Sequence, residues 1–314
     1  MSRLRIVGRR ALQILPVLLG LTIATFALIH LVLGDPARAL AGQRATPEIL
    51  ASIRHQLGVD RPVVAQYGSF VEGLLRGDLG YSFLLRVPVR TLVAARLPTT
   101  VFLVVYACIL AVLLGVPLAV ISAVKRERAP DHFLRGLLVV GLALPSFWIG
   151  VLLISFVALR TGVFPVGGAG EGFVGHLWHL FLPALTLALS FLAVLVRSLR
   201  ASLIEVLDAD YVALARLKGI GRLRLYNRHI LRNALVPAVT ILGLNLSYLL
   251  GASVVVESVF AVPGIGNTLV NAVLSRDYQL VQGIALVFGL LVILITLAVD
   301  LAQTALEPRI EVQA

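Results

Sequence analysis

The side chains best suited to bind another molecule are the basic ones of residues 208–237, a segment between two long apolar stretches. Guanidinium and ammonium groups bind carboxylates, phosphates and anionic lipid headgroups. Apolar residues recur among them at helical spacing, with a glycine midway, so the segment is patterned as well as charged. This favours recognition by a partner over catalysis. The basic residues are Arg216, Lys218, Arg222, Arg224, Arg228 and Arg232.

Motifs for catalysis and metal binding are absent from the sequence. There is no G-x-x-x-x-G-K-[ST] loop for nucleotide phosphates, no H-E-x-x-H motif and no G-x-S-x-G turn. His176 and His179 have an i, i+3 spacing that could hold a metal, but they flank Trp178, which is more typical of an aromatic belt at a membrane surface. We expect no catalytic residue, no metal and no cofactor on this chain. Energy for any work must come from elsewhere.

The composition is that of an integral membrane protein. Hydrophobic residues make up 59% of the chain, charged residues only 14%, and the mean hydropathy is +0.97. Soluble domains average about 45–50% apolar and about 25% charged residues. The single cysteine, Cys108, lies in an apolar run, which excludes a disulfide framework. The net charge of +11 would suit nucleic acid or anionic lipid, but charge asymmetry across a membrane explains it better.

Six stretches are long and apolar enough to cross a bilayer, which needs about 20 helical residues. Small residues are interspersed in all six and allow close helix packing in lipid. The first stretch is longer than the apolar core of a signal peptide, so we expect it to be retained. The sequence therefore predicts an all-α membrane protein with spans at 11–33, 98–124, 133–159, 180–200, 233–256 and 281–302.

The distribution of basic residues predicts the orientation. With both termini in the cytoplasm, 17 of the 27 Lys and Arg residues lie on the cytoplasmic side, as the positive-inside rule requires. Most of the others lie in residues 34–97, a segment long enough that its charge counts little.

Residues 34–97 also predict a small helical segment outside the membrane. One amphipathic pattern begins at Pro47 and ends at Gly58, and a second runs from Val64 to Leu75 and ends before Gly77. The segment either shields the ends of the spans or docks a partner, and the pattern does not decide between the two.

The basic segment predicts two helices separated by a glycine. Asp208 is a candidate N-cap, helix-compatible residues follow through Lys218, and Gly219 can supply the left-handed conformation that ends many helices. A second helix is expected from Arg222 into the fifth span. Anchoring to headgroups would explain the charge alone, whereas a broken, patterned helix suits insertion into a groove of a soluble partner.

Residues 257–280 join the last two spans on the outer side. Irregular backbone at membrane depth is tolerated only where protein or a water-filled cavity covers it. The segment either lines the outer mouth of a pathway, where it would contact a solute or its carrier, or packs helices closely through its glycines. The residues expected at such a mouth are Glu257, Pro263, Gly264, Gly266, Arg276 and Asp277.

The chain resembles the permease subunits of bacterial ABC importers, and more narrowly the dipeptide/oligopeptide/nickel permease family. The basic segment carries the strongest likeness, and weaker motifs in the same order cover almost the whole chain. The main motifs are Asp210-Tyr211-Val212, Ala215-Arg216-x-Lys218-Gly219, His229-x-Leu231-Arg232-Asn233-Ala234-Leu235-x-Pro237, Gly34-Asp35-Pro36-Ala37, Gly77-Asp78-Leu79-Gly80-x-Ser82, Leu144-Pro145-Ser146-Phe147-Trp148, Glu257-Ser258-Val259-Phe260 and Pro263-Gly264-Ile265-Gly266.

The resemblance implies a type I importer fold, with residues 1–97 preceding a core permease domain at 98–314 and a coupling helix at about 208–222. It implies partners: a second homologous permease, ATPase subunits that bind ATP and magnesium, and an extracytoplasmic solute-binding protein that delivers peptides or, alternatively, nickel. The chain departs from the broader family in having Ala213 where a glutamate is usual. The residues implied in ATPase coupling are Asp210, Tyr211, Ala215, Arg216, Lys218, Gly219, Arg222, His229, Arg232 and Asn233.

Two functions of other classes compete with this one. An ion-coupled secondary transporter predicts carboxylates near the middle of the spans and internal inverted repeats, and the sequence has neither. A membrane-anchored scaffold would not require the glycine-broken basic helix.

Overall fold

The computed structural model describes residues 14–27, 46–57, 60–82, 84–218, 221 and 231–306. These residues are mostly helical and form two compact units. The first unit draws on residues 1–98 and 264–294, and the second on residues 99–263 and 295–314. Residues 264–294 thus belong with the N-terminal part, which the sequence did not suggest; the predicted division at 97 and 98 stays a prediction.

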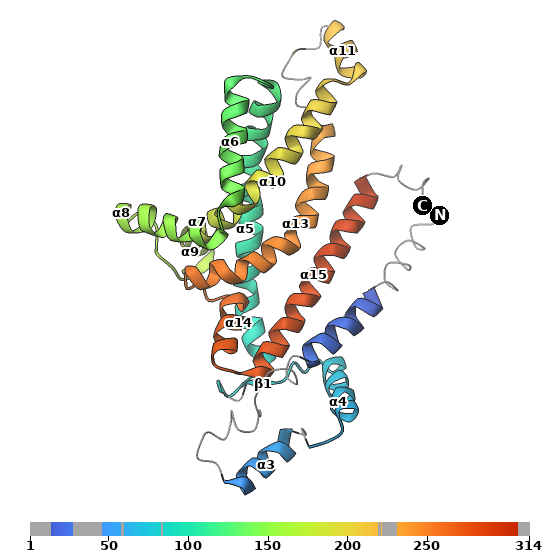
Figure 1. Ribbon diagram of the computed structural model, residues 1–314, viewed down its shortest axis with the longest axis vertical. Helices are drawn as coiled ribbons and strands as arrows, with labels where there is room; N and C mark the ends of the chain where they lie inside the picture. Colours follow the sequence, from blue (N-terminus) through green and yellow to red (C-terminus); the bar gives the residue numbers. More distant parts are fainter. Residues whose placement is uncertain are drawn as a thin grey trace. The chain divides into compact units, whose positions relative to one another are not determined.

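The first unit contains two short helices where the sequence predicted them (Figure 1). Helix α3 is Pro47–Leu57 and α4 is Val63–Leu75, so both amphipathic patterns are confirmed. Between them, the Nδ1 atom of His55 lies 2.8 Å from a carboxylate oxygen of Asp60. That hydrogen bond lowers the pKa of Asp60 below its ordinary value.

Helix α4 packs on the apolar helix Ile14–Ala27 through aromatic side chains. The rings of Phe26 and Tyr67 are 5.3 Å apart in an edge-to-face arrangement, and those of Phe26 and Phe70 are 5.7 Å apart. The hydroxyls of Thr22 and Tyr67 share a hydrogen bond of 2.9 Å. Such aromatic pairs add about 0.5–1.5 kcal/mol beyond their burial. Helix α4 therefore packs through the face that carries Tyr67 and Phe70.

The core of the first unit lies where the start of α5 (Val89–Val124) meets α14 (Ile265–Leu274) and α15 (Tyr278–Leu306). An antiparallel hairpin of β1 (Tyr81–Ser82) and β2 (Val87–Pro88) precedes α5. The sequence did not predict this hairpin, whose strands are too short to show alternation. The buried core residues are Val89, Val93, Ile265, Ala272, Leu280 and Ile284.

The second unit is organised around α10 (Phe181–Leu207), which is buried along much of its length. It packs against α6 (Ala129–Ala143), α7 (Ser146–Leu153) and α13 (Leu231–Val259). The remaining elements are η1 (Ile154–Ala158, a π-helix), α8 (Leu159–Thr161), α9 (Gly172–His179) and α11 (Asp210–Leu217), together with most of α5 and the end of α15.

Three helices of the described residues are long and apolar enough to cross a membrane: Val89–Val124, Phe181–Leu207 and Tyr278–Leu301. They contain or overlap the predicted spans at 98–124, 180–200 and 281–302. The apolar helix Ile14–Ala27 and the apolar part of α13, Asn245–Val259, are shorter.

The predicted single span at 133–159 is wrong in one respect, because it is broken. Helix α6 ends at Ala143, α7 begins at Ser146, and the segments on either side are bent by 103°. Pro145 has no N–H to donate and disfavours helical backbone in the residue before it. Leu144 is accordingly extended, with φ −86° and ψ 124°.

Candidate functional site

Helix α11 follows α10 almost directly, at the place where the basic segment begins (Figure 1). The predicted N-cap role of Asp208 is wrong, because Asp208 ends α10 and donates its N–H to the carbonyl of Ile204 at 3.0 Å. Its carboxylate instead accepts a hydrogen bond of 3.1 Å from Arg126. Helix α11 begins at Asp210, whose negative charge suits the positive end of the helix dipole.

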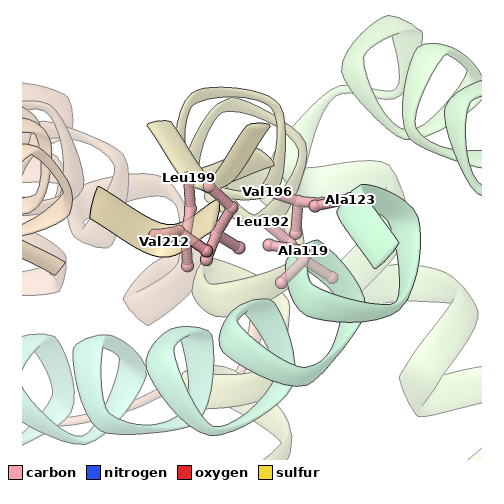
Figure 2. Packing of buried hydrophobic residues seen from close by; sticks show 7 residues of the cluster. Ala119, Ala123, Leu192, Val196, Leu199 and Val212 are labelled. Carbon is pink, nitrogen blue, oxygen red and sulfur yellow. The ribbon is translucent and has the colours of Figure 1, made fainter. Parts of the chain in front are cut away.

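Helix α11 is fixed to the second unit by Val212, which is 0% exposed. Val212 belongs to a cluster with Leu199 and Leu203 of α10 and with Ala119 and Ala123 of α5, and Figure 2 shows it beside Leu199. Fully burying an aliphatic side chain of this size contributes about 1.5–3 kcal/mol. The helix is thus held against α10 and α5 and does not project freely.

The other side of α11 is exposed and apolar. The side chains of Tyr211, Leu214 and Leu217 are all exposed, and that of Leu217 is 84% exposed. Exposed apolar side chains grouped on one short helix are typical of a surface that another protein covers.

The structure describes the side chains of some predicted coupling residues and only the backbone of others, and the rest lie outside the described residues. Asp210, Tyr211 and Lys218 are exposed on or just after α11. The backbone of Ala215 and Arg216 is in α11, and that of Arg232 and Asn233 is in the first turn of α13. Gly219, Arg222 and His229 lie outside the described residues, as does the predicted second helix from Arg222 up to residue 230.

A buried ion pair close to α11 was missed by the sequence reasoning. The carboxylate of Asp131, in the first turn of α6, is 0% exposed and accepts two hydrogen bonds from Arg200 of α10, at 2.9 and 2.7 Å. Ser122 of α5 donates at 2.5 Å and the N–H of Glu127 at 3.0 Å. The only available signal was that Asp131 is an acid immediately before an apolar run and Arg200 a base within one.

At the other end of α13, Glu257 is buried within the second unit. The hydroxyl of Thr100 in α5 donates to its Oε1 atom at 2.6 Å. Helix α13 then ends with Ala261 in a left-handed conformation (φ 47°), and the N–H of Val262 bonds to the carbonyl of Glu257 at 2.8 Å. This pattern is a Schellman ending, which leaves Pro263 to start the connection to α14.

The four other residues predicted at the outer mouth belong to the first unit. Gly264 and Gly266 are buried at the start of α14. Arg276 is exposed and takes a left-handed conformation (φ 59°) where α14 ends, a position that glycine usually fills. Asp277 is buried, accepts a hydrogen bond from Ser82 and accepts another from the N–H of Leu280 at 3.3 Å. It therefore caps α15.

The histidine pair lies within an aromatic cluster of the second unit. His176 and His179 bond through Nδ1 to carbonyls of their own helix, at 2.7 and 3.0 Å. The ring of His176 is 5.5 Å from that of Phe102, and Trp178 is 4.7 Å from Phe164. Among the described residues, no three His, Cys, Asp or Glu side chains are grouped to hold a metal ion.

Comparison with known proteins covers nearly the entire chain. Residues 115–312 match the family described as binding-protein-dependent transport system inner membrane component, and residues 3–104 match the N-terminal part of such components. The glutathione transport system permease protein GsiC of Escherichia coli O6:H1 is 39% identical over 308 residues, 98% of this chain and 99% of that protein. The dipeptide transport system permease protein DppB of Escherichia coli K12 is 37% identical over 334 residues, 98% of each chain.

Solved structures share the fold at lower identity. A chain of the MetNI methionine ABC transporter, in an inward-facing conformation, matches with a TM-score of 0.58 at 18% identity, over 68% of this chain and 95% of its own. A chain of an amino acid ABC transporter crystallised with histidines matches with a TM-score of 0.54 at 18% identity, over 69% and 94%. The chain belongs to the inner membrane components of binding-protein-dependent transport systems, as an ABC importer permease of the peptide family.

Proposed function

We propose that this chain forms one half of the pore of an ATP-driven importer of small peptides, and that α11 is the helix through which ATPase subunits act on it. A second permease subunit completes the pore, and a solute-binding protein delivers the peptide. The chain itself carries no catalytic step, because hydrolysis takes place on the ATPases. The observation that carries the proposal is the build of α11, anchored by buried Val212 and presenting Tyr211, Leu214 and Leu217 outward.

The proposed topology has six spans with both termini in the cytoplasm. Three come from the long apolar helices, a fourth from the bent pair of α6 with α7 to α8, and two from the helix Ile14–Ala27 and from α13. The excess of Lys and Arg on the side of α11 supports this orientation. Arg276, exposed at the end of α14, is the residue we assign to the outer mouth.

A peptide substrate is supported by the relatives, which are permeases for glutathione and for dipeptides. The test uses proteoliposomes that contain this chain and the products of the neighbouring open reading frames, with ATP inside. Uptake of labelled glutathione or of a dipeptide should require both ATP and the binding protein. Uptake of nickel without uptake of either peptide would show that nickel is the substrate. Uptake driven by a proton gradient without ATP would favour an ion-coupled transporter.

Replacing Leu217 with glutamate should weaken ATPase binding about tenfold or more, because the exposed apolar contact gains a charge that must be desolvated. The measurement is the amount of ATPase that copurifies with the permease in detergent.

The matched control is Leu75→Glu, since Leu75 ends α4 and is 85% exposed, almost the same as Leu217 at 84%. Leu75→Glu should leave copurification unchanged. Equal copurification in both variants would mean that α11 contacts lipid headgroups rather than an ATPase.

Replacing Gly219 with valine should uncouple ATP hydrolysis from uptake, because a β-branched residue resists the left-handed conformation that we predict there. Membrane insertion should be normal, since the spans are untouched. Uptake and hydrolysis are measured in the same proteoliposomes, and uptake at the normal rate would contradict the predicted glycine break.

A further inference from the structure

We propose that the buried ion pair of Asp131 and Arg200 is the joint that carries movement of α11 into α5 and α6. The inference rests on the proposed function, because it assumes that ATPases act on α11. It assigns a positioning role to two residues that lie outside the basic segment and that contact neither nucleotide nor solute.

The carboxylate of Asp131 connects three elements at once. Its Oδ1 atom accepts from Ser122 at 2.5 Å and from Nε of Arg200 at 2.9 Å. Its Oδ2 atom accepts from Nη2 of Arg200 at 2.7 Å and from the N–H of Glu127 at 3.0 Å. Ser122 is in α5, Glu127 is in the turn after it, and Arg200 is in α10. A two-point guanidinium contact also fixes the angle between its partners.

The path from Arg200 to α11 is short and stiff. Residues 201–207 of α10 contain neither glycine nor proline, and two residues then lead into α11. Val212 packs α11 back against Leu199, the residue directly before Arg200 (Figure 2), in a cluster that also contains Leu203. A force on the exposed face of α11 therefore rotates the end of α10 rather than bending a loop.

Burial distinguishes this pair from an ordinary surface contact. Asp131 is 0% and Arg200 17% exposed, so neither side chain can exchange its partner for water without leaving a poorly solvated charge. The pair of Arg126 and Asp208 joins the same region by a single contact of 3.1 Å, but its side chains are 52% and 68% exposed. Exposed ion pairs of that kind contribute little to stability. The pair of Arg126 and Asp208 therefore serves as the control.

Weakening the contact between Asp131 and Arg200 should uncouple ATP hydrolysis from movement of the pore. In Asp131→Asn the side chain keeps its shape but loses the charge that holds Arg200. The end of α10 can then follow α11 without Asp131 drawing α6 and the end of α5 at Ser122 along with it. ATP is hydrolysed, and the pore does not change state.

The experiment measures peptide uptake per ATP hydrolysed in proteoliposomes for the wild-type complex, Asp131→Asn and the control Arg126→Gln. We expect Asp131→Asn to lower this ratio at least tenfold with hydrolysis retained, and Arg126→Gln to stay within twofold of wild type. An unchanged ratio in an assembled Asp131→Asn complex overturns the proposal, and so does an equal fall in Arg126→Gln.

A second variant keeps the test decisive if Asp131→Asn does not assemble. Arg200→Lys preserves the charge but loses the two-point contact. A lowered ratio in that variant supports the joint; an unchanged ratio, or a failure of this variant to assemble as well, assigns the pair to folding alone and overturns it. Failure of the proposed function is recognised separately, because the wild-type complex would then show no ATP-dependent peptide uptake.

Discussion

Replacing Gly167 with alanine is expected to lower the stability of the second unit by about 3 kcal/mol or more, at or above the upper end of the usual range for a single substitution. The added methyl group would collide with the carbonyl oxygen of Phe260 and lie 3.0 Å from its carbonyl carbon. Backbone cannot swing aside as a side chain can. The neighbouring Gly168 N–H also donates to the same oxygen at 3.2 Å, so the clash breaks a hydrogen bond as well.

The measurement is the yield of monodisperse protein and its melting temperature in detergent. The control is Gly136→Ala, because a methyl group at Gly136 in α6 would meet nothing within 4 Å. That change should be neutral or slightly stabilising, since alanine is favoured over glycine in a helix by about 0.5–1 kcal/mol. If Gly167→Ala were as stable as this control, the close contact of the 162–171 loop with the end of α13 would be wrong.

Replacing Asp277 with alanine is expected to lower the stability of the first unit by about 2–4 kcal/mol, the combined loss of an N-cap and of a buried hydrogen-bond partner. Asp277 caps α15 through the N–H of Leu280 and accepts from the buried hydroxyl of Ser82. Both contacts lie within the first unit. The melting temperature in detergent reports the loss.

The conservative variant Asp277→Asn separates this structural role from direct contact with solute. Asparagine is a good N-cap, because its amide oxygen can keep the hydrogen bond from the N–H of Leu280. Its amide nitrogen then takes the place of Oδ2 and can donate to the hydroxyl of Ser82, so stability and uptake should both stay near wild type. A carboxylate that bound a peptide amine would behave differently. Loss of uptake in a stable Asp277→Asn protein would restore Asp277 to the outer mouth, beside Arg276.

Apolar runs and helix stop signals were sufficient to predict the helices α3, α4, α5, α10 and α15. The ends of α3 and α4 also followed from glycine positions, since α3 stops directly before Gly58 and α4 two residues before Gly77. These features are local, and local features are what a single sequence records.

The break at Pro145 could not be predicted with the same security. Pro117 lies inside α5 and Pro183 in the first turn of α10, and both helices continue through them. A proline in the first turn loses no internal hydrogen bond. Pro117 lies in the interior of α5, where its missing N–H removes a hydrogen bond of the helix, yet the helix continues. Packing against neighbouring helices decides at which proline a span bends and at which the helix continues.

The ion pair of Asp131 and Arg200 was equally inaccessible, because the two residues are 69 positions apart. Arg200 is one of eight basic residues in 197–232, and it shares its place at the end of an apolar run with Arg197. The basic, glycine-broken pattern of residues 208–237 was visible in the sequence, whereas the contacts that hold α11 in place exist only once α5, α6 and α10 have packed.

The 103° bend between α6 and residues 146–161 affects the two leaflets of a bilayer unequally. An upright helix occupies a circle about 10 Å across in both leaflets, whereas a segment of this length lying on its side is about 24 Å long at a single depth. When α6 stands upright in the bilayer, the exposed side chains of Phe147, Trp148 and Phe156 fill space in one leaflet only. The second unit then displaces more lipid on that side, so transport should respond to lateral pressure and to the ratio of cone-shaped to cylindrical lipids.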